Sequence, residues 1–138
     1  MEHTIAAIST PVGVGGISVI RISGSNAFSV AKSMFKSKTP FESIKSHTVT
    51  YGTVQDEKGN TLDHVLLLKM QAPKTYTGED TVEIHCHGGI YVTKKILAMA
   101  YANGAHPAQP GEFTKRAFVN SHIDLMEAEA VMDLINSE

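Results

Sequence analysis

The chain contains a single cysteine, Cys86, among its 138 residues. One cysteine has no partner for an intramolecular disulfide, which fits a protein of a reducing compartment. The longest apolar runs fall far short of the roughly 20 residues that cross a bilayer. The first ten residues also lack the basic start and long apolar core of a secretory signal. We therefore expect a soluble, cytoplasmic protein with no membrane partner.

An excess of basic residues is also missing, because the net charge is -2. Domains that bind nucleic acid alone usually carry a strong excess of Lys and Arg. If the protein acts on RNA, another domain or a partner must therefore supply most of the phosphate binding. The pattern Gly-x-x-x-x-Gly-Lys-Ser/Thr is absent as well. We expect this chain alone not to bind a nucleoside triphosphate through a P-loop.

What the sequence does contain is enough apolar material for one core, since 42% of the residues are hydrophobic. Stretches rich in β-branched or alternating residues predict strands at 4–10, 17–23, 46–55, 61–70 and 81–87. Helical spacing predicts a helix from an N-cap at Ser25 to near Ser37, and another from Gly89 to Asn103. A polar loop is expected at 71–80. We predict an α+β fold: a mixed or antiparallel sheet with two to three packed helices.

The end of the chain predicts a further helix over 124–135. Asp124 and Glu127 have the spacing of a capping box. An apolar stripe follows, formed by Leu125, Ala128, Val131, Met132 and Ile135. Little of the chain remains to cover this stripe, so we expect a first domain at 1–120 and the start of a helical domain at 121–138. In isolation, that stripe should be disordered or paired with another molecule.

Two features near the N-terminus suggest ligand binding. Gly13, Gly15 and Gly16 resemble part of a dinucleotide fingerprint, but a strand is predicted after them where that fingerprint needs a helix. A tight turn between strands is the simpler interpretation. Arg21 lies on a strand that is apolar on both faces, where an unpaired cation is costly. It is either an edge-strand residue that reaches solvent or an anchor for an anionic ligand.

The segment VEIHCHGG, at 82–89, concentrates polar groups on one strand. Alternation places Glu83, His85 and His87 on one face, and Cys86 on the apolar face as a small buried residue. The three polar side chains could chelate a metal ion or simply face solvent or a ligand. Gly88 and its neighbour allow a close approach of the backbone.

A second polar group surrounds Phe113 and Phe118 near the last helices. It consists of Glu112, Arg116, Asn120 and Asp124. The simplest interpretation is a solvated helical face whose ion pairs contribute little each.

Linked motifs give the sequence a family resemblance. The segments TIAAISTPVGVGGISVIRISG, APKTYTGEDTVEIHCHGG and PGEFTKRAFVNSHIDLMEAEAVMDLI resemble the MnmE (TrmE) family of tRNA modification GTPases. The resemblance extends over the whole chain in order. It implies an N-terminal α+β domain similar to the tetrahydrofolate-binding part of glycine-cleavage T-proteins. It also implies a homodimer and a longer parent protein.

The resemblance further implies a function. The family domain binds 5-formyl-tetrahydrofolate, a stand-in for the donor 5,10-methylene-tetrahydrofolate. The full-length protein binds GTP with Mg and K, and hydrolyses it in a domain that this chain does not include. With the FAD-dependent partner MnmG, it modifies carbon-5 of the wobble uridine of certain tRNAs. We therefore expect no catalytic residue and no metal site in this chain.

Three folate-binding positions are implied by the family. They fall on Arg21, Glu83 and His122, where His122 replaces the usual lysine. A carboxylate at Glu83 suits adjacent N–H donors of a reduced pterin, and Arg21 suits the anionic glutamate tail. Two alternatives remain: a metal-dependent hydrolase using Glu83, His85 and His87, or an interface domain without a ligand.

Overall fold

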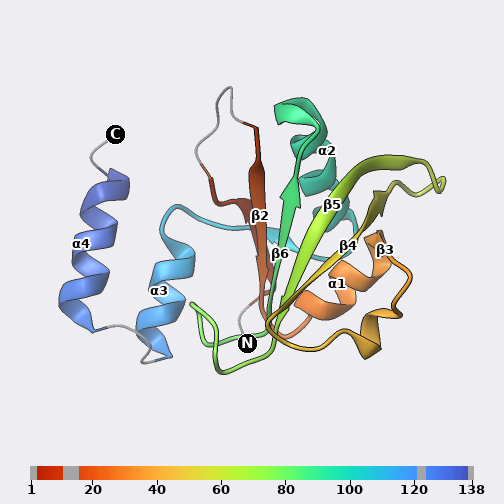
Figure 1. Ribbon diagram of the computed structural model, residues 1–138. Helices are drawn as coiled ribbons and strands as arrows, with labels where there is room; N and C mark the ends of the chain where they lie inside the picture. Colours follow the sequence, from red (N-terminus) through yellow and green to blue (C-terminus); the bar gives the residue numbers. More distant parts are fainter. Residues whose placement is uncertain (1–2, 11–15, 121–123, 137–138) are drawn as a thin grey trace.

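The structure is a computed structural model that describes residues 3–10, 16–120 and 124–136 (Figure 1). The strands are β1 (Ile5–Ile8), β2 (Ser18–Ser23), β3 (Phe35–Lys36), β4 (Thr48–Gln55), β5 (Thr61–Met70), β6 (Thr81–Cys86) and β7 (His106–Pro107). The α-helices are α1 (Ala27–Met34), α2 (Gly89–Ala102), α3 (Glu112–Val119) and α4 (Leu125–Asn136). A short 3-10 helix, η1 (Phe41–Ser43), precedes β4.

The described strands form one sheet in the order β3-β4-β5-β6-β2-β1-β7. All of its pairings are antiparallel except that of β1 with β7. The predicted α+β class is therefore confirmed, and β4 and β5 form an antiparallel hairpin. The residues after the glycine loop form strand β2, as predicted, so the helix that a dinucleotide fingerprint requires is not there. The glycine loop itself, at 11–15, lies outside the described residues.

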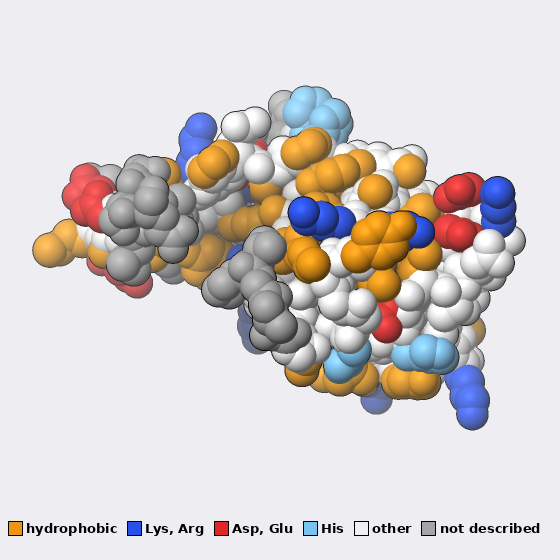
Figure 2. Space-filling model, turned by 90° about the horizontal axis from the view of Figure 1, so that it is seen from above, with side chains coloured by type: hydrophobic (Ala, Val, Ile, Leu, Met, Phe, Trp, Pro, Cys, Tyr) orange, Lys and Arg blue, Asp and Glu red, His pale blue; other side chains and the backbone are white. Residues whose placement is uncertain are grey.

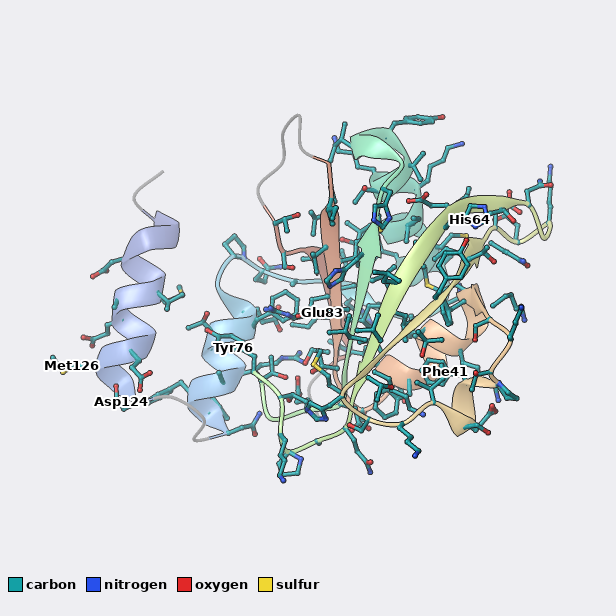
Figure 3. All side chains as sticks on the ribbon, viewed as in Figure 1. Phe41, His64, Tyr76, Glu83, Asp124 and Met126 are labelled. Atoms are coloured by element: carbon teal, nitrogen blue, oxygen red, sulfur yellow. The ribbon has the colours of Figure 1, made fainter. Side chains whose placement is uncertain are left out.

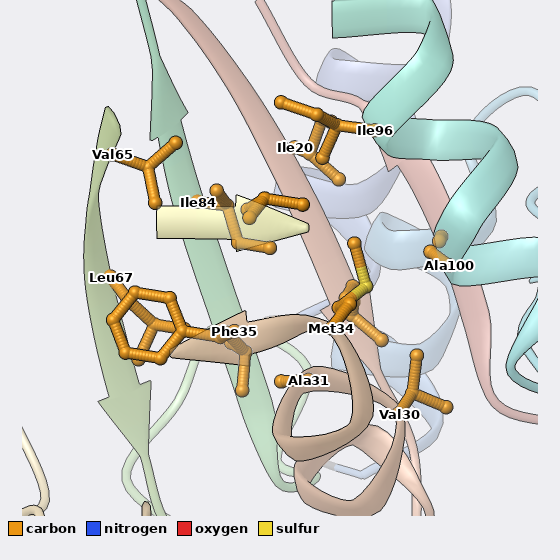
Figure 4. Packing of buried hydrophobic residues seen from close by; sticks show 14 of the residues in the cluster. Ile20, Val30, Ala31, Met34, Phe35, Val65, Leu67, Ile84, Ile96 and Ala100 are labelled. Carbon is orange, nitrogen blue, oxygen red and sulfur yellow. The ribbon is translucent and has the colours of Figure 1, made fainter. Parts of the chain in front are cut away.

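One face of the sheet carries the core, covered by α1 and α2 (Figure 1). Alternation along β2 and β6 turns every second side chain toward these helices. Figure 4 shows how side chains from strands and helices interdigitate there. The fully buried large residues include Ile20, Ile22, Met34, Leu67, Ile84 and Ile96. Cys86 is 1% exposed within this core, which confirms its assignment to the apolar face.

The other face of the sheet is covered in part, by α3 and the 71–80 loop, and α4 lies outermost beside α3 (Figure 1). Seen from above, basic side chains occupy separate places and do not form one continuous area (Figure 2). None of the helices in the described part of the chain is long and apolar enough to span a membrane.

Helix α1 differs from its prediction at both ends. It ends at Met34 instead of near Ser37, because Phe35 takes an extended conformation and pairs with Val54. Phe35 is 4% exposed there, so joining the sheet keeps its ring in the core. The N-cap is Asn26, not Ser25, and no side chain caps it. Instead, the amide of Asn26 donates to the hydroxyl of Thr4 at 2.9 Å.

Helix α4 confirms the predicted capping box. The amide of Glu127 donates to the Asp124 carboxylate at 2.8 Å, and the Asp124 amide donates to the Glu127 carboxylate at 3.3 Å. Of the predicted stripe, Val131 and Met132 are half-buried. The side chains of Leu125, Ala128 and Ile135 lie outside the described residues. Met126, which points away from the domain in Figure 3, is 81% exposed.

Candidate ligand-binding site

Arg21 lies on an interior strand, because β2 runs between β1 and β6. The interpretation of an edge-strand residue is therefore wrong. The antiparallel register places Arg21 opposite Glu83 of β6. Its Nε donates to Oε2 of Glu83 at 3.1 Å, and the two side chains are 22% and 20% exposed. Two residues that were singled out separately in the sequence thus form one ion pair.

Two aromatic rings frame the Arg21 guanidinium. Its central carbon lies 5.4 Å from the ring centre of Tyr76 and 5.1 Å from that of Phe113. Both distances allow a cation–π attraction. Tyr76 comes from the 71–80 loop and Phe113 from the first turn of α3. Among the described residues, Glu83 is the only one that forms a hydrogen bond with the Arg21 side chain, and this bond leaves the terminal N–H groups for a ligand.

These groups border a cavity of about 610 Å³. Its wall includes Ala7, Ile8, Ser9 and Thr10 from β1 and the residues after it, Arg21 from β2, Tyr76, residues 108–111, Phe113 and Thr114 of α3, and Val131 of α4. The volume lies within the usual range for small-molecule sites. Arg21 is the only charged residue among the described residues that line it, so the cavity suits a flat ligand that carries a negative charge. Glu83 does not line it.

A buried arginine fixes α3 against the 71–80 loop. Arg116 is 3% exposed, and its Nη1 donates to both carboxylate oxygens of Glu79, at 3.1 and 3.2 Å. Its Nη2 donates to the carbonyl of His3 at 2.6 Å and to Glu112 at 3.1 Å. The predicted solvated helical face is therefore wrong at this position. The sequence signals only the Glu112 contact, by its four-residue spacing.

Further polar contacts hold the loop in place. Glu79 also accepts from the Ser23 hydroxyl at 2.8 Å, which joins the loop to β2. Asn120 donates through Nδ2 to the carbonyl of Thr77 at 2.7 Å. The hydroxyl oxygens of Tyr76 and Thr114 lie 2.9 Å apart. Tyr76 is thereby fixed between the loop and α3, where Figure 3 shows it.

The two histidines of the VEIHCHGG segment, His85 and His87, have different surroundings. His85 Nε2 lies 3.7 Å from Oε1 of Glu83, a distance too long for a hydrogen bond. His87 lies beyond the end of the strand, where its amide and that of Gly88 donate to Asp63 at 2.7 and 2.9 Å. Asp63 therefore fixes the start of α2, a role that the sequence did not reveal.

The chemistry expected of a metal hydrolase or of a reactive thiol has no support in this geometry. No three His, Cys, Asp or Glu side chains gather as metal ligands anywhere in residues 3–10, 16–120 and 124–136, so Glu83, His85 and His87 do not form a chelating trio. Burial raises the pKa of the Cys86 thiol to about 12, which keeps it protonated and unreactive. The third predicted folate position, His122, lies outside the described residues.

Comparison with known proteins places these features in a family. The family model described as "GTP-binding protein TrmE N-terminus" matches residues 4–122. The chain is 59% identical over 138 residues to the tRNA modification GTPase MnmE of Acetivibrio thermocellus, covering 99% of this chain and 30% of that protein. It is 55% identical over 136 residues to the protein of the same name from Lactobacillus delbrueckii subsp. bulgaricus, covering 98% and 29%. The chain thus spans less than a third of the length of these relatives.

Proposed function

The chain belongs to the family of TrmE N-terminal domains, and from that premise we propose that it is the tetrahydrofolate-binding, homodimerising module of a tRNA modification GTPase. The parent protein would act with the FAD-dependent MnmG on carbon-5 of the wobble uridine of certain tRNAs. It would hydrolyse GTP, with Mg and K, outside this chain. The family membership and the names of the relatives support this proposal.

The observation that carries folate binding is the position of Arg21 in the wall of the cavity. A reduced folate combines a flat pterin with an anionic glutamate tail. The Tyr76 and Phe113 rings offer surfaces for a flat group, and the terminal N–H groups of Arg21 offer a partner for a carboxylate. The residues present therefore fit a folate derivative such as 5-formyl- or 5,10-methylene-tetrahydrofolate. When bound, such a cofactor supplies a one-carbon unit.

The structure changes the role of Glu83 in this proposal from that of a pterin acceptor alone. Its Oε2 already accepts from Arg21 and Glu83 does not line the cavity, so we keep a contact of Oε1 with a pterin N–H donor on the family resemblance alone. Glu83 also fixes the guanidinium by accepting the hydrogen bond of Nε. The carboxylate thus orients the arginine as well as offering an acceptor. We keep His122 as the third proposed contact on the family resemblance alone.

A titration with 5-formyl-tetrahydrofolate tests this proposal. Calorimetry on the 138-residue chain should give saturable binding, and the ligand should raise the melting temperature. Arg21→Gln and Glu83→Gln each remove a charge-assisted contact worth about 1.5–3 kcal/mol, so each should weaken binding by roughly tenfold to a hundredfold. Glu57→Gln is the matched control, because Glu57 is an exposed turn residue.

The same titration separates the alternatives. A folded chain that gives no heat and no thermal shift would contradict folate binding and favour an interface domain without a ligand. If Arg21→Gln leaves the affinity for 5-formyl-tetrahydrofolate unchanged, the cavity beside Arg21 is not the folate site. Folding of each variant is checked by circular dichroism, since loss of the ion pair can also affect stability.

We further propose that the folate-binding and dimerising domain is 1–120 and that 121–138 begins a helical domain. The family match supports this boundary, because it ends at residue 122. The dimer is proposed on the family resemblance alone. Sedimentation equilibrium tests the dimer, and a monomer over the whole micromolar range would contradict it.

A further inference from the structure

Strand β4 has an outer edge that is largely unpaired. On one side, β4 pairs with β5 along its length. On the other side, β3 is only two residues long and pairs with Thr53 and Val54. In the described part of the chain, no strand pairs with the outer edge of residues 48–52, and no backbone hydrogen bond outside the ladders involves them. Alternate residues there direct free N–H and C=O groups outward.

A groove runs along this open edge. It has a volume of about 550 Å³ and lies between residues 36–39 and residues 49–53. Val49 and Tyr51 are 58% and 64% exposed on the same face of the strand. The Tyr51 hydroxyl lies 2.9 Å from Nδ1 of His64, and the two rings stack with centres 6.1 Å apart. The tyrosine is therefore held in place while most of its ring faces solvent.

The charged residues that the structure describes along this groove are all lysines. Lys36 and Lys38 line it and are exposed, and none of the described residues that line it is acidic. Neither lysine forms an ion pair with any of the described residues. A partner that carries carboxylates would therefore find two available cations beside a free strand edge.

We propose that the β4 edge binds an extended acidic segment of another protein by strand addition. The free backbone groups of residues 48–52 supply the hydrogen bonds of the added strand. Val49 and Tyr51 contact alternate side chains of that segment, and Lys36 and Lys38 pair with its Asp or Glu residues. A second copy of this chain fits less well, because it would bring both pairs of lysines into one groove. This inference does not depend on folate binding.

The test uses a fluorescein-labelled pool of short peptides in which Glu or Asp alternates with Val, Ile or Thr. Fluorescence anisotropy with the 138-residue chain should show saturable binding. The double variant K36E/K38E should weaken it by about tenfold or more. K58E/K94E, which reverses two exposed lysines away from the groove, should leave it unchanged. A pool N-methylated at every backbone amide should not bind, because no edge of such a peptide keeps the N–H donors that strand addition needs.

Each other outcome overturns the proposal. Peptide binding that is absent, or that K36E/K38E leaves unchanged, means that the lysines only protect the edge from aggregation. Self-association that K36E/K38E changes in sedimentation would identify a second copy as the occupant. Binding of an oligouridylate probe that depends on these lysines, without binding of the peptide pool, would identify single-stranded RNA instead.

Discussion

Replacement of Arg116 by methionine is the sharpest test of how the candidate site is held together. Methionine keeps a similar length and good helix propensity while removing the guanidinium. The change deletes the hydrogen bonds to Glu79, to Glu112 and to the carbonyl of His3. It leaves two carboxylates close to a buried position without their cation.

The expected loss follows from the burial of these groups. Removing one partner of a buried ion pair costs about 3–5 kcal/mol, because the other charge stays poorly solvated. Arg116 is 3% exposed, whereas the Glu79 and Glu112 side chains keep 19% and 20% exposure. Water can therefore reach both carboxylates, and Glu79 retains the Ser23 donor. We accordingly expect the lower end of the range, a loss of about 3 kcal/mol in the free energy of unfolding.

Urea unfolding followed by circular dichroism measures this loss. With a slope of about 2 kcal/mol per molar urea, the midpoint should fall by about 1.5 M while the slope stays constant. Lys115→Met is the control, since Lys115 is the exposed neighbour on α3 and should change the free energy by less than about 0.5 kcal/mol. The double variant R116M/E79Q should recover about 1 kcal/mol or more relative to additivity, because it also removes a stranded charge.

A loss below about 1 kcal/mol for R116M would refute this reasoning, because it would make Arg116 equivalent to an exposed ion pair. Strict additivity in the double variant would refute the specific pairing with Glu79.

Three further changes test other parts of the fold. The Cys86 thiol should react with a disulfide reagent at pH 8 only after unfolding, and rapid labelling of the native chain would contradict its burial. The free energy of unfolding should fall above pH 9.0, because the unfolded thiol ionises there while the folded thiol stays protonated up to a pKa of about 12. Asp63→Ala should lower stability by about 1 kcal/mol, since it removes the acceptor at the start of α2, and an unchanged melting curve would contradict this. Gly52→Ala should be strongly destabilising in the same assay, because its Cβ would lie 2.3 Å from the carbonyl oxygen of Lys36, and a variant as stable as wild type would contradict that close approach.

The fold class and strand positions could be predicted because they rest on local patterns. Alternation along 81–87 separated Cys86 from Glu83, and helical spacing found α2 and α4. The change at Phe35 could not be predicted, because helical spacing continues through it and only the pairing with Val54 overrides that spacing. Tertiary contacts often override local propensity in this way.

The sequence singles out Arg21 and Glu83 but not the contact between them. Arg21 and Glu83 were each identified, yet their pairing depends on the register between β2 and β6, which no local pattern contains. Arg116 was seen as exposed because α3 alone gives no sign of the loop that covers it. The roles of Tyr76 and Asp63 were missed for the same reason, since each contacts a segment distant in the sequence.

The cavity wall combines residues 7–10 and Arg21 with Tyr76 and with residues between 108 and 131, so it forms only when distant parts of the chain meet. The β1 strand pairs with β7, and β2 pairs with β6, so each pairing closes a long loop of the chain at a cost in entropy. Such non-local pairings slow folding. During synthesis, the N-terminal part of the wall must wait for α3 to leave the ribosome. A ligand of this cavity would therefore recognise only a finished domain, and would report on the completion of folding in a growing chain.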